Sequence, residues 1–260
     1  MLKAETTDRV RLLTLDRPEV LNAFNDALFG ALREALTDAA DDDGVAAVVV
    51  TGEGRAFSAG ADLTEMGDRT GDGGSRDASH FPPLIELLAE FPKPLLIAVN
   101  GIGVGIGATI LGFADLAFMA ADARLRCPFT ALGVAPEAAS SSTFPALIGR
   151  QNAAWVLLSS EWIDAEEALE MGLVWKVCEP EELLDVALDH ARRLARMPIA
   201  SLVESKRLIG AGTRDAIAAA RKAEDEAFGR LLAGPAAQEA IAAFIEKREP
   251  DFTDLPSTAS

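Results

Sequence analysis

Two short apolar runs, each closed by a polar residue and a glycine, constrain the fold most: VAAVVVTG at residues 45–52 and LLIAVNG at residues 95–101. A strand that faces water on one side alternates polar and apolar residues, whereas these runs do not. Uninterrupted apolar runs are typical of parallel strands that are covered on both faces. Before the first run, apolar side chains recur at helical spacing in residues 22–43, with Asn22 or Asn25 as the N-cap. The pattern predicts an α/β fold.

Strand and helix patterns alternate through about residue 195. Residues 9–18 and 116–121 are predicted strands, and a helix is expected to end at Pro92. Residues 69–79 are rich in Gly, Ser and Asp, which predicts a mobile loop. Three helical patterns without strands then occupy residues 200–212, 213–232 and 236–248. We therefore divide the chain between Met197 and Pro198, into a core (1–197) and a C-terminal helical region (198–260).

The charge of the chain excludes several classes of partner. Lys and Arg number 24 against 41 Asp and Glu, a net charge of −17, which argues against binding to nucleic acid or to an anionic membrane. The apolar stretch at residues 94–121 contains Asn100, Asp115 and several glycines, so a strand, a turn and a buried helix fit it better than a membrane span.

Cysteine and histidine are scarce. The two cysteines, Cys127 and Cys178, lack metal-binding spacing, and the two histidines are far apart in the sequence, so neither a metal site nor a disulfide framework is expected. The first 18 residues contain no signal-peptide pattern. Together these features predict a cytoplasmic protein.

Two segments of small residues, each after an apolar strand, offer free backbone amides. In AFSAGADL (residues 56–63), the amides of Gly60, Ala61 and Asp62 would suit an anion, although a tight turn with Asp62 starting a helix explains the same residues. In NGIGVGIGATI (residues 100–110), a dinucleotide-binding pattern fails because Ile106 and Ala108 stand where glycine is needed. Two amide sources suggest an oxyanion hole for a thioester enolate.

Several motifs in order resemble the crotonase (enoyl-CoA hydratase/isomerase) superfamily: GRAFSAGADLTEM, PKPLLIAVNGIGVGIGATILGFADLAF and IDAEEALEMGLVWKV. The resemblance spans nearly the whole chain. It implies a core of the ββα-superhelix type, a C-terminal trimerisation region, and a homotrimer or a dimer of trimers. It also implies an acyl-CoA substrate with no cofactor beyond the coenzyme A of that substrate. The matching oxyanion-hole donors are the amides of Ala61 and Ile106.

The acid/base positions decide which reaction the resemblance implies. Hydratases of this superfamily use two glutamates, and Thr109 and Phe129 occupy those positions here. The remaining carboxylate near the acyl site is Glu137. It lies in CPFTALGVAPEAASSSTFPALIG, a stretch similar to peroxisomal-type Δ3,Δ2-enoyl-CoA isomerases. In that subgroup this glutamate is the base, and the second amide donor is a larger aliphatic residue, as Ile106 is. The implied role is isomerisation of 3-enoyl-CoA in fatty-acid β-oxidation.

Alternatives to this role remain open at the level of sequence. Glu137 is equally explained as a first-turn glutamate of a helix that begins at Pro136. The enzyme alternatives are an enoyl-CoA hydratase and a thioester hydrolase, and the third is a non-catalytic acyl-CoA-binding protein. Arg17 is a further candidate for the CoA phosphates. The residues expected to contact the substrate are Ala59, Gly60, Asp62, Leu63, Gly105, Phe129, Lys93 and, from a neighbouring chain, Lys247.

Overall fold

The apolar runs form the middle of a six-stranded sheet. The structure is a computed structural model that describes residues 1–62, 79–246 and 248–255. The strand order is β1 (Leu2–Thr7), β2 (Val10–Leu15), β3 (Ala47–Gly52), β5 (Leu95–Val99), β7 (Leu116–Ala120) and β10 (Lys176–Cys178). Neighbours from β2 to β10 are parallel, and every residue of β3 and β5 is buried. The predicted α/β class and the strands covered on both faces are confirmed.

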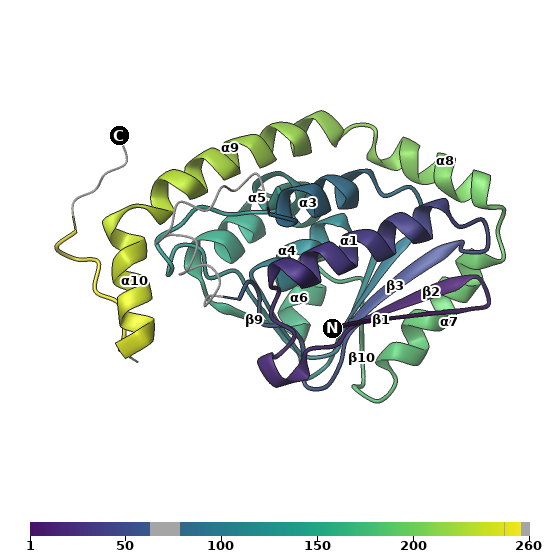
Figure 1. The fold of residues 1–260 in the computed structure, drawn as a ribbon, viewed down its shortest axis with the longest axis horizontal. Helices are drawn as coiled ribbons and strands as arrows, with labels where there is room; N and C mark the ends of the chain where they lie inside the picture. The colour runs from purple at the N-terminus through teal and green to yellow at the C-terminus, as the bar shows by residue number, and fades with distance from the viewer. Residues whose placement is uncertain (63–78, 247, 256–260) are drawn as a thin grey trace.

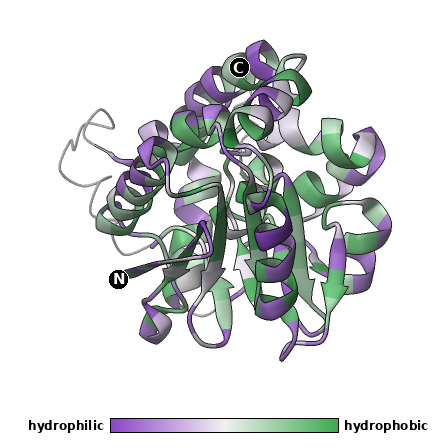
Figure 2. Cartoon of the chain, turned by 90° about the vertical axis from the view of Figure 1, so that its right-hand side faces the viewer, coloured by the Kyte–Doolittle hydropathy of each residue, from purple (hydrophilic) through white to green (hydrophobic). Residues whose placement is uncertain are grey.

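Helices cover this sheet. The helices that follow β2, β4 and β10 are α1 (Asp26–Asp41), α3 (Phe81–Glu90) and α7 (Leu183–Ala195). In α1, Leu28, Leu32 and Leu36 are fully buried, and the Asn25 side chain accepts from the Leu28 N–H, so Asn25 is the N-cap. Helix α7 packs across β2, β3, β5, β7 and β10. Figure 2 shows hydrophobic strands in the interior and hydrophilic patches on the surrounding helices.

A second, smaller sheet carries the segments of interest. Its order is β4 (Ala56–Ser58), β6 (Ile102–Val104), β8 (Arg124–Arg126) and β9 (Trp162–Asp164). β4, β6 and β8 are parallel neighbours, so the turns that follow β4 and β6 leave the same edge. The remaining helical elements of this part are η1 (Pro18–Val20), α4 (Ile106–Thr109), η3 (Ile110–Phe113), α5 (Ser140–Ser159) and α6 (Ala165–Met171).

In its described residues, the C-terminal region contains three helices, as the sequence predicts. They are α8 (Ile199–Gly210), α9 (Arg214–Leu232) and α10 (Pro235–Glu246). Figure 1 shows α8 and α9 running along one side of the molecule before α10 turns away, and α9 contacts both α5 and α10. The division between Met197 and Pro198 falls in the link between α7 and α8. That division, like the trimer, stays a prediction.

Some expectations concern features that the fold does not decide. Within residues 1–62, 79–246 and 248–255, no helix has the length and apolarity needed to cross a bilayer. The same residues contain no cluster of His, Cys, Asp and Glu that would hold a metal ion. Cys127 and Cys178 are buried free thiols. The predicted mobile loop at residues 69–79 falls, except for Ser79, outside the described residues.

Candidate active site

The first amide turn follows β4 and is held by backbone hydrogen bonds to Phe24. The Phe24 N–H donates to the Gly60 carbonyl at 2.7 Å, and the Asp62 N–H donates to the Phe24 carbonyl at 2.8 Å. Because successive N–H groups of an extended chain point to opposite sides, the Ala61 N–H faces away from Phe24. Among the described residues, nothing accepts a hydrogen bond from that N–H.

The second amide turn joins β6 to α4. Gly105 adopts a φ of 53°, and its carbonyl accepts from the Ala108 and Thr109 N–H groups, both at 2.9 Å. Ile106 is the first residue of α4, so its N–H has no acceptor within the helix. No acceptor for it is found elsewhere in the described chain. Within the described part of the chain, both amides that the resemblance names as oxyanion-hole donors are therefore without an acceptor.

The two turns lie against each other, and the Glu137 carboxylate lies beside Gly105 of the second turn. A Cβ placed on Gly60 would be 2.8 Å from the Val104 carbonyl oxygen. A Cβ placed on Gly105 would be 3.9 Å from the Gly60 Cα and 3.7 Å from Glu137 Oε1. Two amides that have no acceptor among the described residues thus lie close to one carboxylate, which is the arrangement needed to move a proton next to a developing oxyanion.

Glu137 lies in a loop rather than in a helix. Ala138 and Ala139 have φ values of 58° and 55°, in the left-handed region, and α5 begins only at Ser140. The prediction that Pro136 is the first helical residue, with Glu137 in the first turn, is therefore wrong. Proline fixes only its own φ, and the left-handed alanines interrupt any helix that would start there. We define residues 133–139 as the Glu137 loop.

The surroundings of Glu137 are partly apolar. Cys127, at the start of the segment leading to the loop, is fully buried. Burial and then the charge of Glu137 raise the pKa of the Cys127 thiol, which places the carboxylate near this side chain and keeps the thiol neutral. Glu137 itself is half-buried. A half-buried carboxylate is accessible to a ligand yet partly shielded from water.

The positions at which hydratases carry glutamates are buried and uncharged. Thr109 is fully buried in α4, and no described atom bonds its hydroxyl. Phe129 is 3% exposed and belongs to the hydrophobic core. Neither side chain is able to exchange a proton near neutral pH. Glu137 is the carboxylate that the structure places beside Gly105 of the second amide turn.

Several predicted substrate contacts have other partners. The Arg17 side chain donates to the Ala23 carbonyl and forms an ion pair with Asp62 at 3.6 Å, which agrees with Asp62 as an anchor of its turn.

Lys93 is 3% exposed, and its Nζ donates to the carbonyls of Ala39 and Asp42, both at 2.7 Å. Lys93 therefore ties α1 to the sheet and has no access to a phosphate in this structure. Ala59, Gly60 and Gly105 belong to the two turns. Leu63 and Lys247 lie outside the described residues.

Two buried polar side chains support the site and are not evident from sequence. Asn22 is fully buried; its Nδ2 donates to the carbonyls of Glu53 and Ala56, and its Oδ1 accepts from the Arg17 N–H. In the sequence LNAFND, Asn22 gives only a weak signal, because the same pattern also allows it to be an N-cap. Glu224 is 5% exposed and lies in α9, where the surrounding RKAEDE looks like a solvated helix face.

Comparison with known proteins decides the family. Residues 5–255 match the family described as enoyl-CoA hydratase/isomerase. The chain belongs to this family. The 1,2-epoxyphenylacetyl-CoA isomerase of Escherichia coli is 36% identical over 250 residues, covering 94% of this chain and 95% of that one. The 2,3-dehydroadipyl-CoA hydratase of the same organism is 36% identical over 244 residues, with 94% and 95% coverage.

Solved structures agree with this family membership. The enoyl-CoA hydratase EchA8_6 from Mycobacterium marinum is 61% identical, with a TM-score of 0.76 over 80% of this chain and 98% of that one. An enoyl-CoA hydratase/isomerase from Pseudoalteromonas atlantica is 36% identical, with a TM-score of 0.90 over 96% and 99%. The expected crotonase-like α/β fold is confirmed, and the protein is a crotonase-type acyl-CoA enzyme.

Proposed function

We propose that this enzyme moves the double bond of a 3-enoyl-CoA thioester to the 2 position, as the peroxisomal-type isomerases do. The observation that carries the proposal is the position of Glu137 Oε1, whose distance from a Cβ placed on Gly105 would be 3.7 Å. One carboxylate beside two free amides suffices for this reaction, which needs neither an activated water nor a second acid. One of the relatives is itself named an isomerase of a CoA thioester, 1,2-epoxyphenylacetyl-CoA, so isomerisation of such thioesters occurs among relatives of this chain.

The chemistry follows from the arrangement. The amides of Ala61 and Ile106 would bind the thioester oxygen and stabilise the negative charge that develops on it. Glu137 would take the proton from C2, leaving a dienolate whose charge is spread over the thioester oxygen, C2 and C4. Returning the same proton to C4 forms the C2–C3 double bond and restores the carboxylate. No atom is gained or lost, so the enzyme ends in its starting state.

The test is to replace Glu137 by Gln, which keeps the shape of the side chain and removes its basicity. We expect turnover of 3-hexenoyl-CoA, followed by the absorbance of the conjugated product, to fall about 10²- to 10⁴-fold. Affinity for a saturated acyl-CoA should be unchanged. The matched control is Glu170→Gln, at an exposed glutamate of α6, which should keep full activity. Near-normal turnover by Glu137→Gln would rule out the proposal.

The second candidate is hydration of a 2-enoyl-CoA. It is favoured by relatives named hydratases, among them the 61% identical Mycobacterium marinum protein. Thr109 and Phe129 argue against it, because hydration in this family uses two carboxylates and these side chains supply none. Assaying crotonyl-CoA hydration beside 3-hexenoyl-CoA isomerisation separates the two. Faster hydration than isomerisation would favour the hydratase, release of free CoA a thioester hydrolase, and binding without turnover a non-catalytic role.

We also propose the wider setting that the resemblance implies. The substrate would arise in the β-oxidation of unsaturated fatty acids, in the cytoplasm. The chain would assemble as a homotrimer or as a dimer of trimers through its C-terminal helices, with no metal and no cofactor other than the CoA of the substrate. Measuring the molar mass by light scattering tests the assembly.

A further inference from the structure

The Glu137 loop is enclosed by the C-terminal helices as well as by the core. At its first residue, Gly133 has a φ of 66°, and a Cβ there would be 2.6 Å from the Ala236 carbonyl carbon and 2.7 Å from the Ala237 nitrogen. The loop backbone therefore lies directly against the start of α10. At its last residue, the Ala139 N–H bonds a side chain from α9. Both ends of the loop are thus fixed by helices remote in the sequence.

The side chain from α9 is Glu224, the only buried residue of that helix. Its Oε2 accepts from the Ala139 N–H at 2.6 Å, and its Oε1 accepts from the Ser141 N–H at 2.8 Å. Burial raises the pKa of Glu224, and the nearby Ser141 hydroxyl acts in the opposite direction. Burying a carboxylate is costly unless hydrogen bonds replace those it made with water. These hydrogen bonds explain why the one fully buried side chain of α9 is a carboxylate.

Two alanines in the left-handed conformation, Ala138 and Ala139, follow Glu137 in the chain. A Cβ disfavours this conformation, so it persists only where surrounding contacts impose it. The Glu224 carboxylate supplies such contacts, because it bonds the N–H of Ala139 itself and that of Ser141. Relaxation of either alanine would rotate the preceding peptide and move Glu137 relative to Gly105.

We propose that Glu224 is a positioning residue for Glu137: by holding the amides of Ala139 and Ser141, it keeps the Glu137 carboxylate beside Gly105, at the start of α4. The inference rests on the proposed role of Glu137 as the base. Glu224 acts through the loop, so its loss should slow proton transfer without weakening binding of the thioester. The C-terminal region would then contribute to the chemistry as well as to the fold.

The test compares Glu224→Gln with Glu226→Gln, an exposed glutamate of the same helix. Glutamine keeps the size of the side chain but places an NH₂ group against one of the two N–H donors. We expect kcat for 3-hexenoyl-CoA isomerisation to fall about 10- to 100-fold, with KM and butyryl-CoA affinity unchanged. The Ala139 and Ser141 amides should also exchange faster with deuterium. Glu226→Gln should match the parent protein in every measurement.

The combination with Glu137→Gln separates the two proposals. If Glu224 acts through Glu137, adding Glu224→Gln to Glu137→Gln causes no further loss of the residual rate. The same fold-loss in both backgrounds, or an unchanged kcat in Glu224→Gln, overturns the positioning role and leaves Glu137 as the base. Full activity of Glu137→Gln alone overturns the proposed function instead. If Glu224→Gln does not fold, Ser141→Ala replaces it in the test, because this substitution removes only the hydroxyl beside the Glu224 carboxylate. We then expect a lower kcat at an unchanged KM. An unchanged kcat overturns the inference.

Discussion

At the scale of single residues, the site depends most directly on Gly60. Its φ is 92°, and a Cβ would be 2.8 Å from the Val104 carbonyl oxygen, well inside van der Waals contact. Gly60→Ala would therefore push the β4 turn away from the β6 turn and displace the Ala61 amide. We expect kcat/KM to fall about 10²- to 10³-fold, the loss typical of removing one oxyanion-hole donor. Steady-state kinetics with 3-hexenoyl-CoA measures it.

The matched control for this prediction is Gly172→Ala. Gly172 has a similar φ of 82°, but nothing lies within 4 Å of a Cβ placed there. Gly172→Ala should lower the unfolding free energy by about 1–2 kcal/mol, the cost of the left-handed conformation for a residue with a Cβ, and should leave kcat/KM unchanged. Equal kinetic effects of the two substitutions would show that the close approach at Gly60 does not set the position of the amide.

Residues differ in how far the sequence alone predicts them. The small residues around Ala61 and Ile106 were identifiable because only such residues let two backbones meet, and their order matches a family. Lys93 and Glu224 were not, because a charged residue looks solvated until its partners are known. Lys93 bonds carbonyls at the end of α1, and Glu224 bonds amides 83 and 85 residues away. Such long-range pairs leave no local pattern.

At the scale of elements, local signals predicted most boundaries and failed at α5. Helix α1 begins where Asn25 caps it, and β3 and β5 coincide with the apolar runs, because each signal lies within the element. The start of α5 is set instead by two left-handed alanines that Glu224 holds from another helix. Alanine favours helix, so tertiary contacts override the local preference there.

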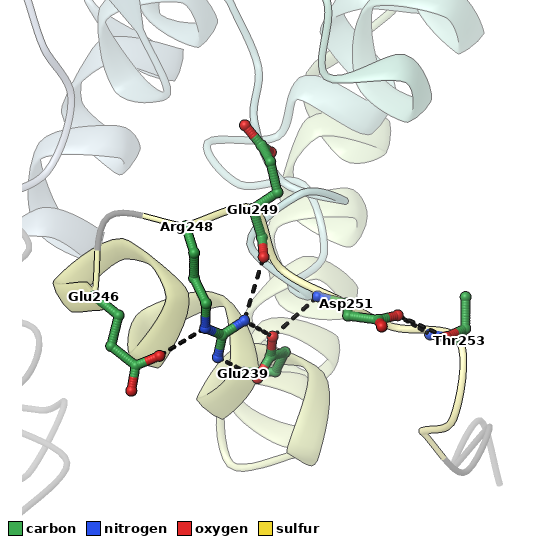
Figure 3. Close-up of polar contacts among 6 residues, drawn as sticks. All are labelled: Glu239, Glu246, Arg248, Glu249, Asp251 and Thr253. Carbon is green, nitrogen blue, oxygen red and sulfur yellow. Dashed lines mark hydrogen bonds and ion pairs between the residues drawn. The ribbon is translucent and has the colours of Figure 1, made fainter.

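The end of α10 is fixed by charge, which makes it sensitive to pH. Figure 3 shows Arg248 bonding the carboxylates of Glu239 and Glu246, while Glu239 also accepts from the Asp251 N–H at 2.9 Å. First the Arg248 guanidinium and then the Asp251 amide lower the pKa of Glu239 to about 2. Since its ordinary pKa is 4.5, the stability it contributes is fully present above that pH and is lost as the pH falls towards 2.

Glu239→Gln tests this linkage. We expect the unfolding temperature of the variant to lie below that of the parent protein at neutral pH, with a difference that shrinks as the pH falls below 4.5. Added salt should also shrink the difference, because the pair is partly exposed. Glu226→Gln on α9 serves as the control and should show no such difference. A gap that stays constant down to low pH would contradict the assignment.

At the scale of the whole molecule, the turn after β6 of the smaller sheet and the C-terminal helices both lie against the Glu137 loop. The central strands β3 and β5 of the six-stranded sheet are fully buried, whereas α8 has no buried side chain and α9 has one. Segments with little buried apolar surface open at lower free energy than the core. Helix α10 lies against the first residue of the Glu137 loop, and α9 bonds its last residue. Opening of these two helices should therefore release the loop while the sheet stays folded.

Hydrogen–deuterium exchange at increasing denaturant tests this coupling. Peptides covering residues 133–141 should lose protection at the same denaturant concentration as those from α9 and α10, and below that at which β3 and β5 do. Isomerase activity should disappear in the first step, because Glu137 would no longer be held over Gly105. If residues 133–141 stay protected together with the sheet after α9 has exchanged, then the core alone fixes the loop, and the C-terminal helices are not part of the active site's support.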